Sequence, residues 1–325
     1  MTENSGSNAR DVRNKRIFDK LRRELGPVIC EWLERPDVNE IMLNDDGRVW
    51  GVAFGQPKKH IYTMTESYAE SVMATLADIN KTVVNHEEPL LECGFHFSGR
   101  YRRFAGALPP CSLGPQFNIR CPPVEVYPLS DYVEKGIMTP RQYEVICQLI
   151  REKKNIVITG GTFSGKTTLL NAIIAQIAIE LPSVRLGILE DTYELQCQVQ
   201  DNIRLFTTKD ISMQTLLKHL LRRFPNGIIT GEVRDGACLA LCEAWNTGHE
   251  GGAATIHSNT VTPQAGLMRL ESLIEQATNA DKRALIGEAV DCLICIEATD
   301  KGRRVTSITR VLGFENDNYV LENME

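Results

Sequence analysis

A glycine-rich segment near the middle of the chain limits the possible folds more than any other feature. It stands between a short apolar stretch, residues 155–159, and residues 166–179, whose apolar side chains recur at helical spacing. The segment matches the pattern Gly-x4-Gly-Lys-Ser/Thr in the strand, turn and helix setting that this pattern requires. We therefore expect a parallel sheet covered by helices on both faces. The residues of the segment are Gly160, Gly161, Thr162, Phe163, Ser164, Gly165, Lys166, Thr167 and Thr168.

The residue types of this segment suit the binding of a phosphate chain. Glycines let backbone N–H groups turn inward around phosphate oxygens, and the positive end of the following helix adds to the attraction. We expect Lys166 to bridge the β- and γ-phosphates and Thr167 to bind Mg²⁺. Kinases, GTPases, transporters and motors all use such loops, so the segment predicts a nucleotide ligand and leaves the reaction open.

Polar residues also follow three other predicted strands of the second half. Because the carboxyl ends of parallel strands meet at one edge of a sheet, we expect these residues to lie beside the glycine-rich loop. Carboxylates there can hold Mg²⁺ or water, orient or deprotonate an attacking water, and a histidine can sense the γ-phosphate. Each one alone is more often a helix cap or a satisfied loop residue. They are Glu190 and Asp191 after residues 184–189, Glu232 after residues 228–230, and His257 after residues 253–256.

The chain divides into two predicted domains. Residues 1–121 form a mixed α+β domain, and residues 138–325 alternate strand and helix. Prolines gather in residues 122–137, which we interpret as the linker. The expected elements of the first domain are a helix over residues 10–35 that breaks at Gly26-Pro27, a hairpin over residues 41–52, a helix over residues 66–80, and strands at residues 103–107 and 116–120.

The first predicted helix is basic and amphipathic. Residues 10–23 hold seven basic side chains and two acidic ones, and an apolar stripe follows the helical period through Ile17, Leu21 and Leu25. A helix of this kind can lie on an anionic membrane surface. The alternative, which we favour slightly, is that the stripe packs on its own domain or on a neighbouring subunit.

Composition excludes several classes of protein. The 325 residues carry 36 Lys plus Arg and 42 Asp plus Glu, a net charge of −6, which argues against a dedicated DNA-binding protein. Residues 1–10 lack the apolar core of a secretory signal, and residues 167–179 fall short of the roughly 20 apolar residues needed to cross a bilayer. Cys292 and Cys295 have metal or redox spacing, yet they lie in an apolar run, so we interpret them as small buried hydrophobes.

Four motifs together resemble the type II/type IV secretion ATPase superfamily in order and spacing. They are residues 160–168, 189–195, 231–234 and 246–257, which look like its Walker A, Asp-box, Walker B and His-box motifs. Residues 40–50, 103–110 and 117–120 look like the N-terminal domain of the conjugative-transfer branch, the TrbB-type ATPases.

The resemblance implies a RecA-like P-loop NTPase domain in an α/β protein, preceded by a smaller α+β domain. It implies a cytoplasmic hexameric ring, peripheral to the inner membrane, that hydrolyses ATP with Mg²⁺ to drive assembly or substrate transfer in a conjugation machine. By this resemblance, Lys166 and Thr167 hold phosphate and Mg²⁺, Glu232 is the catalytic carboxylate, and Glu190 supports metal or water. His257 senses the γ-phosphate, and Arg103 and Arg120 reach the nucleotide from the N-terminal domain.

The chain departs from the family pattern at three places. Phe163 stands where the family usually has Gly, so a positive φ there would strain the loop and slow turnover. Residues 222–227, which include Phe224, replace a segment that carries two further arginines and an aspartate in the family. Ala237 replaces a usual Glu, so the charge pairing between subunits is expected to differ.

The departures keep a second hypothesis open, a nucleotide-binding structural subunit of the same machine that hydrolyses ATP weakly. A nucleic-acid translocase is a third hypothesis, but the acidic charge balance and the lack of clustered aromatic and arginine residues argue against it. A small-molecule kinase would need a lid and an acceptor pocket, for which the sequence offers no candidate.

Overall fold

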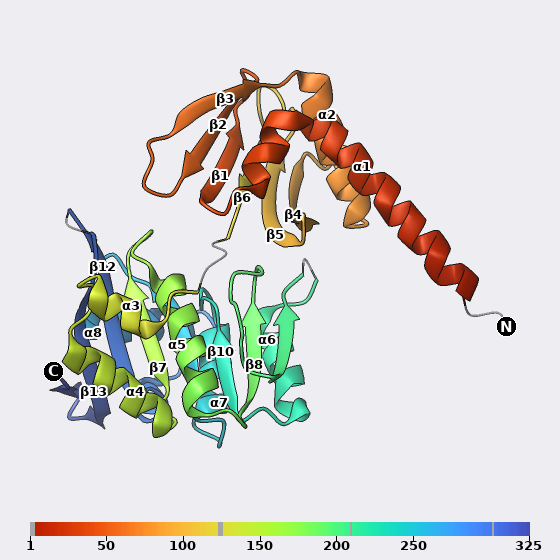
Figure 1. Cartoon of the computed structure of the whole chain (residues 1–325). Helices are drawn as coiled ribbons and strands as arrows, with labels where there is room; N and C mark the ends of the chain where they lie inside the picture. Colours follow the sequence, from red (N-terminus) through yellow and green to blue (C-terminus); the bar gives the residue numbers. More distant parts are fainter. Residues whose placement is uncertain (1–3, 123–125, 209, 301) are drawn as a thin grey trace. The chain divides into compact units, whose positions relative to one another are not determined.

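The computed structural model describes the backbone of residues 4–122, 126–208, 210–300 and 302–325, and the side chains of these residues from Arg16 onward. The chain forms two compact units, Met1–Glu125 and Val126–Glu325 (Figure 1). Among the described residues, no helix has both the length and the apolarity needed to cross a membrane.

The first unit is built on a six-stranded antiparallel sheet with the order β3-β2-β1-β6-β5-β4. The expected hairpin is confirmed, with β1 and β2 paired in antiparallel register, whereas β3 and β4 were not predicted from the sequence. The elements are α1 (Asn4–Glu34), β1 (Val38–Leu43), β2 (Arg48–Ala53), β3 (Lys59–Thr63), α2 (Glu66–Ile79), β4 (Leu90–Phe97), β5 (Arg100–Ala107) and β6 (Gln116–Arg120).

Helix α1 breaks where the sequence predicted. Gly26 has φ 77° and ψ 165°, outside the helical region, and Pro27 follows it. Leu21, Leu25 and Ile29 are fully buried in the core of the first unit. From Leu21 onward the apolar stripe therefore packs on its own unit, as the favoured alternative predicted. Arg10, Arg13 and Lys15 of the basic segment lie outside the residues whose side chains are described.

The second unit contains an eight-stranded sheet with the order β14-β13-β12-β7-β11-β10-β8-β9. The six strands from β12 to β9 pair in parallel, and β13 and β14 add an antiparallel edge, so the predicted mainly parallel sheet is confirmed. Its strands are β7 (Ile156–Gly160), β8 (Arg185–Glu190), β9 (Asp201–Phe206), β10 (Gly227–Thr230), β11 (Ala253–His257), β12 (Cys292–Thr299), β13 (Gly302–Glu315) and β14 (Asn318–Asn323).

Helices cover both faces of this sheet (Figure 1). Side chains of β7 alternate between two cores, Ile156 and Ile158 with α3, α4 and α5, and Val157 with α6, α7, α8 and α9. Cys292 and Cys295 are fully buried on β12, as expected of small apolar residues. The helices are α3 (Leu129–Glu134), α4 (Pro140–Arg151), α5 (Lys166–Glu180), α6 (Met213–Leu220), a 3-10 turn η1 (Leu221–Arg223), α7 (Ala237–Trp245), α8 (Pro263–Glu275) and α9 (Arg283–Ala289).

The segment interpreted as a linker, residues 122–137, contains helix α3. Leu129 and Tyr132 of α3 are buried in the core of the second unit, and the division between the units falls after Glu125. The second unit therefore begins earlier in the chain than the proline content indicated. The reason is that apolar residues between the prolines form a helix face that can be buried. Residues 123–125 lie outside the described part of the chain.

Candidate nucleotide-binding site

The glycine-rich segment forms the turn between β7 and α5, at the carboxyl end of the strand. Lys166 is the first residue of α5, Thr162 is exposed, and Thr167 and Thr168 are half-buried in the first helical turn. The first N–H groups of an α-helix have no acceptor within the helix, and they lie at its positive end. The turn thus has the backbone donors that an anion needs.

The ammonium of Lys166 lies inside the turn. Its Nζ donates hydrogen bonds to the carbonyl oxygens of Gly160, at 2.9 Å, and Gly161, at 2.7 Å. Burial lowers the pKa of Lys166, and the negative charge of Glu232 opposes this effect. The cation is therefore close to the expected catalytic carboxylate and partly removed from solvent.

Close packing shapes the base of the turn. A Cβ on Gly160 would lie 2.3 Å from the carbonyl oxygen of Ile296 and 2.6 Å from Oγ of Ser164, so only glycine fits there. Ser164 is 2% exposed, and no described residue hydrogen-bonds its hydroxyl. A buried hydroxyl in a cradle of glycines and main-chain amides fits a nucleotide phosphate chain.

Phe163 adopts the left-handed conformation, with φ 59°, and its side chain is 76% exposed. Phe163 thus adopts the positive φ for which the sequence analysis expects strain, because this conformation is costly for an L-residue other than glycine. Arg303 of β13 supports the turn from the side: its Nε donates to the Phe163 carbonyl at 3.4 Å, and its Cδ would lie 2.8 Å from a Cβ on Gly165.

Strand register places the other expected residues at the same edge of the sheet. His257 pairs with Gly160, and the N–H of Ser258 donates to the Gly160 carbonyl at 3.2 Å. The neighbouring strand β10 ends at Thr230, whose register partners are Leu189 and Ala254. Glu232 follows directly, so the carboxyl ends of β7, β8, β10 and β11 converge around the turn.

The carboxylate of Glu232 forms an ion pair within its own loop. Arg234 donates from Nε, at 2.9 Å, and from Nη2, at 2.5 Å, to one oxygen of Glu232. The carboxylate of Asp191 lies 3.9 Å from Nη1 of the same guanidinium. The charges of Glu232, Asp191 and Glu194 together raise the pKa of Arg234 against the opposing effect of burial. Three acidic side chains and one arginine thus form a charged cluster beside the turn.

His257 is half-buried at the end of β11. Its Nε2 lies 3.0 Å from Oδ1 of Asn259, so the adjacent loop orients the ring. Two hydrogen bonds tie β11 to the loop that carries Glu232: the Thr255 hydroxyl donates to the Gly231 carbonyl at 2.6 Å, and the Val233 N–H to the Thr255 carbonyl at 2.9 Å. Strand β11 therefore links the histidine and the carboxylate.

Glu190, which the sequence analysis expects to support metal or water, has protein partners in this structure. Its carboxylate is only 2% exposed and accepts three hydrogen bonds, two from backbone N–H groups and one from Arg204. Both oxygens of this buried carboxylate therefore accept hydrogen bonds from the protein. Its position at the end of β8 indicated a site residue, but one of its partners, Arg204, lies on β9, a strand that the sequence analysis did not predict.

Arg103 and Arg120 lie in the first unit, on neighbouring strands. They are direct register partners on β5 and β6, and Glu40 of β1 is the other partner of Arg120. Arg103 is half-buried and Arg120 is exposed. The acidic residue Glu40 thus stands on one side of Arg120 and the basic residue Arg103 on the other.

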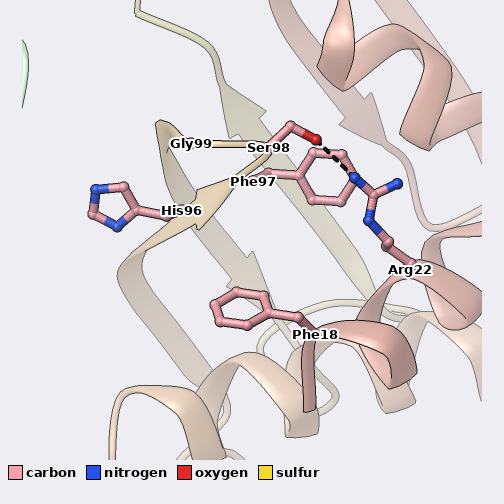
Figure 2. A pocket seen from close by; sticks show the side chains of 6 residues that line it. All are labelled: Phe18, Arg22, His96, Phe97, Ser98 and Gly99. Carbon is pink, nitrogen blue, oxygen red and sulfur yellow. Dashed lines mark hydrogen bonds between the residues drawn. The ribbon is translucent and has the colours of Figure 1, made fainter. Parts of the chain in front are cut away.

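The first unit also has a groove of about 230 Å³ between α1 and the turn that joins β4 to β5. Figure 2 shows Arg22 of α1 reaching that turn, where it donates to the Ser98 hydroxyl at 2.7 Å. The guanidinium also lies over the ring of Phe97, 4.5 Å from its centroid. The groove contains none of the residues that the sequence predicted for nucleotide binding.

Sequence reasoning missed several residues of this site. Arg234 stands inside a quoted motif but received no role, and Glu194 follows Asp191 in another. Arg303 is 140 residues from Phe163 along the chain, and no local signal connects the two. Only the pairing of β13 with β12, and of β12 with β7, brings it to the turn.

A parallel sheet with helices on both faces and a lysine-bearing glycine-rich turn at its carboxyl edge define a P-loop protein. Comparisons with known proteins narrow this class. The family model described as "Type II/IV secretion system protein" matches residues 96–307. The chain belongs to this type II/IV secretion family.

Relatives that align with most of the chain support this family assignment. The chain is 43% identical over 308 residues to the conjugal transfer protein TrbB of Rhizobium radiobacter, covering 95% of this chain and 94% of that one. It is 28% identical over 321 residues to the protein VirB11 of Rhizobium radiobacter, covering 87% and 91%.

Two solved structures share the fold. The pilus retraction motor PilT with bound ADP aligns with a TM-score of 0.61 at 17% identity, covering 91% of this chain and 80% of that one. The ATPase DotB of Legionella pneumophila aligns with a TM-score of 0.60 at 17% identity, covering 88% and 80%.

Proposed function

We propose that this protein is a Mg²⁺-dependent ATPase that powers assembly or substrate transfer in a type IV secretion or conjugation machine. The observation that carries the proposal is the glycine-rich turn, with Lys166 inside it and Glu232 after β10, two strands away at the same edge of the sheet. The 43% identity to a conjugal transfer protein supports a role in a conjugation machine. The ADP bound in the structure of PilT supports an adenine nucleotide as the ligand.

Different groups of the turn would bind the phosphates and the Mg²⁺ ion. Backbone N–H groups of residues 161–168 would surround the phosphates, and Lys166 would exchange its two carbonyl acceptors for phosphate oxygens. The hydroxyl of Thr167 would hold Mg²⁺, with Glu232 acting on it partly through water. When bound, Mg²⁺ would neutralise charge on the phosphate chain.

Glu232 would orient the attacking water or accept its proton. For this its carboxylate must separate from Arg234, which binds one of its oxygens through two donors. Arg234 would then be available for the phosphate oxygens, where a planar guanidinium pairs well. His257, oriented by Asn259, would sense the γ-phosphate from the neighbouring strand. Arg103 and Arg120 of the first unit would add positive charge at the nucleotide.

The test is Mg²⁺-dependent phosphate release by the purified protein. We expect Lys166→Ala and Glu232→Gln each to lower turnover at least a hundredfold, on the order of 2.7 kcal/mol of transition-state stabilisation. Lys218→Ala on α6 and Glu243→Gln on α7 are matched controls, because both side chains are exposed and away from the turn. Wild-type turnover in the Lys166 variant would refute the proposal.

The family implies a ring of six subunits, which we also propose here. The expected result is a sixfold increase in mass when ATP and Mg²⁺ are added, measured by light scattering. A protein that stays monomeric with bound nucleotide would exclude the ring.

A second candidate function is a structural subunit that binds ATP but scarcely hydrolyses it. Two observations favour it: Phe163 occupies a position with positive φ, and Arg234 neutralises Glu232. In that case ATP would tighten assembly while phosphate release stays at background. Wild-type turnover well above that of the Glu232→Gln variant would dismiss it.

We further propose a cytoplasmic location at the inner membrane, with the basic segment of α1 as the contact. The described part of that helix uses Leu21 and Leu25 for its own core, so the contact would depend on residues before them. Co-sedimentation with vesicles that contain anionic lipid should decrease when residues 1–15 are removed. Equal sedimentation of both forms would remove the basis for this contact.

We expect no stimulation of turnover by DNA at low salt.

A further inference from the structure

We propose that Arg204 is a positioning residue for hydrolysis: with Glu190 it forms a buried ion pair that holds residues 191–195 in place beside Glu232. This inference rests on the proposed function, and it assigns Glu190 to the protein framework in place of the metal. The two residues come from neighbouring parallel strands, β8 and β9, and they meet at the carboxyl edge of the sheet.

The carboxylate of Glu190 is the first half of this anchor. One oxygen accepts hydrogen bonds from the N–H groups of Glu194, at 2.8 Å, and Leu195, at 2.6 Å. The other oxygen accepts one from Nη2 of Arg204 at 2.9 Å. A carboxylate that binds the backbone four and five residues ahead closes the intervening residues into a compact loop.

The guanidinium of Arg204 is the second half. Besides Glu190, Nη2 donates to the carbonyl oxygen of Leu195. The guanidinium carbon lies 4.0 Å from the centroid of the Tyr193 ring, a cation–π contact, and the Tyr193 ring stacks on Phe206 of β9 with centroids 5.5 Å apart. One side chain on the edge strand thus holds the loop at its beginning, its middle and its end.

A second attachment joins the same loop to the helix of the nucleotide site. Asn171 lies on α5, one turn beyond Thr167. Its Oδ1 accepts from the N–H of Gln196 at 2.7 Å, and its Nδ2 donates to the Glu194 carbonyl at 3.2 Å. The loop is therefore fixed between α5 and β9, and its position depends on both.

The loop carries two carboxylates toward the site. Asp191 lies 3.9 Å from Arg234, and the charge of Glu194 acts on the same guanidinium. Arg234 in turn binds Glu232. No hydrogen bond joins Arg204 to Glu232 among the described residues, so Arg204 can influence the reaction only through the placement of the loop.

The energetics of buried ion pairs support a positioning role. Glu190 is 2% exposed and the Arg204 side chain 18%, so both charges are largely removed from water. Desolvation offsets most of the attraction in such pairs, and apolar replacements of both partners are often equally stable. What an apolar pair cannot supply are the hydrogen bonds that close the loop.

The first experiment compares turnover with nucleotide affinity. We expect Arg204→Met to lower kcat at least tenfold, while the Kd for a fluorescent ATP analogue with Mg²⁺ changes less than about twofold. Arg204→Lys keeps the charge but not the planar fork, so it should recover part of the loss. A folded Arg204→Met protein with wild-type kcat would overturn the proposal.

Arg185 offers a matched control on the same two strands. It pairs with Asp201 across β8 and β9, but at their amino ends, away from the site. Arg185→Met should keep kcat within twofold of the wild type. An equal loss of kcat in Arg185→Met and Arg204→Met would show that turnover depends on the connection between β8 and β9 and not on the position of the loop. That result would contradict the proposal.

The double variant Glu190→Met, Arg204→Met separates positioning from stability. In Arg204→Met the buried charge of Glu190 has lost its partner, and the double variant removes that charge. Its melting temperature should therefore return toward that of the wild type, while kcat stays low. If kcat returns together with the melting temperature, the pair is merely structural and the inference is wrong.

Hydrogen exchange tests the anchor without any need for hydrolysis. The amides of Glu194 and Leu195 should be protected in the full-length wild type and exchange at least tenfold faster in Arg204→Met. If the wild type shows no turnover at all, the proposed function fails while this result still decides whether Arg204 holds the loop. Unchanged exchange of both amides would refute the anchor.

Discussion

At the scale of single residues, the glycine-rich turn contains a strained backbone conformation at Phe163. Gly165, with φ 98°, can adopt its conformation freely, whereas Phe163, with φ 59°, adopts a similar one against its own Cβ. The ring of Phe163 is 76% exposed, so little packing compensates for the strain. Strain at a functional loop is stable only when the surrounding structure holds it, and here Arg303 and the close-packed Gly160 provide that support.

Phe163→Gly should relieve this strain. We expect the free energy of unfolding to rise by up to about 1 kcal/mol, because glycine accepts a positive φ without a steric penalty, and phosphate release to become faster. Denaturant unfolding and a steady-state assay measure the two effects.

Phe163→Ala is the control for the ring, since alanine removes the aromatic group but keeps the Cβ. It should stay close to the wild type in stability. If alanine and glycine raise turnover equally, the ring and not the backbone conformation limits the rate.

At the scale of single elements, helix ends depend on short side chains that bind their first N–H groups. Thr139 begins α4 with a capping box: its hydroxyl accepts from the N–H of Gln142 at 3.1 Å, and the Gln142 side chain accepts from the N–H of Thr139 at 2.8 Å. Asp281 acts before α9, where it binds both the N–H and the side chain of Arg283.

Thr139→Ala should lower the stability of the second unit by about 1 kcal/mol, the usual cost of a lost cap. For a unit of this size we expect a decrease of roughly 2–4 °C in melting temperature, measured by calorimetry. Thr139→Ser keeps the acceptor and should melt close to the wild type. An alanine variant with unchanged melting would mean that packing alone holds the helix end.

The Asp281 contact makes stability depend on pH in the acid range. Side-chain and backbone hydrogen bonds from Arg283 lower the pKa of Asp281 to about 2, from 3.8 in the unfolded chain. The carboxylate therefore contributes stability above pH 4, and this contribution is lost as the pH falls from 4 to 2. The difference in melting temperature between the wild type and Asp281→Asn should shrink across this range. A difference that is constant with pH would contradict the assignment.

On the scale of the whole molecule, each unit has a hydrophobic core of its own. The first unit buries the apolar faces of α1, α2 and its sheet, and the second buries both faces of an eight-stranded sheet. The turn, Glu232 and His257 all belong to the second unit, whereas Arg103 and Arg120 belong to the first. The residues proposed for phosphate binding and those proposed to supply further cations therefore belong to different folding units.

A fragment of residues 126–325 should fold and bind nucleotide by itself, because its core and all residues of the turn are internal to it. Calorimetric titration with ATP and Mg²⁺ tests this, with Lys166→Ala in the same fragment as the control. A folded fragment that does not bind nucleotide would show that the first unit is required for binding.

Much of the fold was predictable because its signals are local. Helical periodicity predicted α1 and α5, alternation of strand and helix predicted the parallel sheet, and glycine followed by proline predicted the break in α1. The missed strands β3 and β9 are short edge strands whose side chains are mostly exposed or half-buried, so their sequences lack a clear apolar pattern.

The sequence alone determined the glycine-rich turn and the family, because both depend on residue types at fixed spacing along the chain. Only the tertiary structure decided which groups surround that turn. Arg204 reaches Glu190 from 14 residues away, and Arg303 reaches Phe163 from 140 residues away. These contacts depend on strand order and register, which arise from the burial of the whole sheet. A carboxylate at a strand end is therefore visible in the sequence, while the partner that determines its role is not.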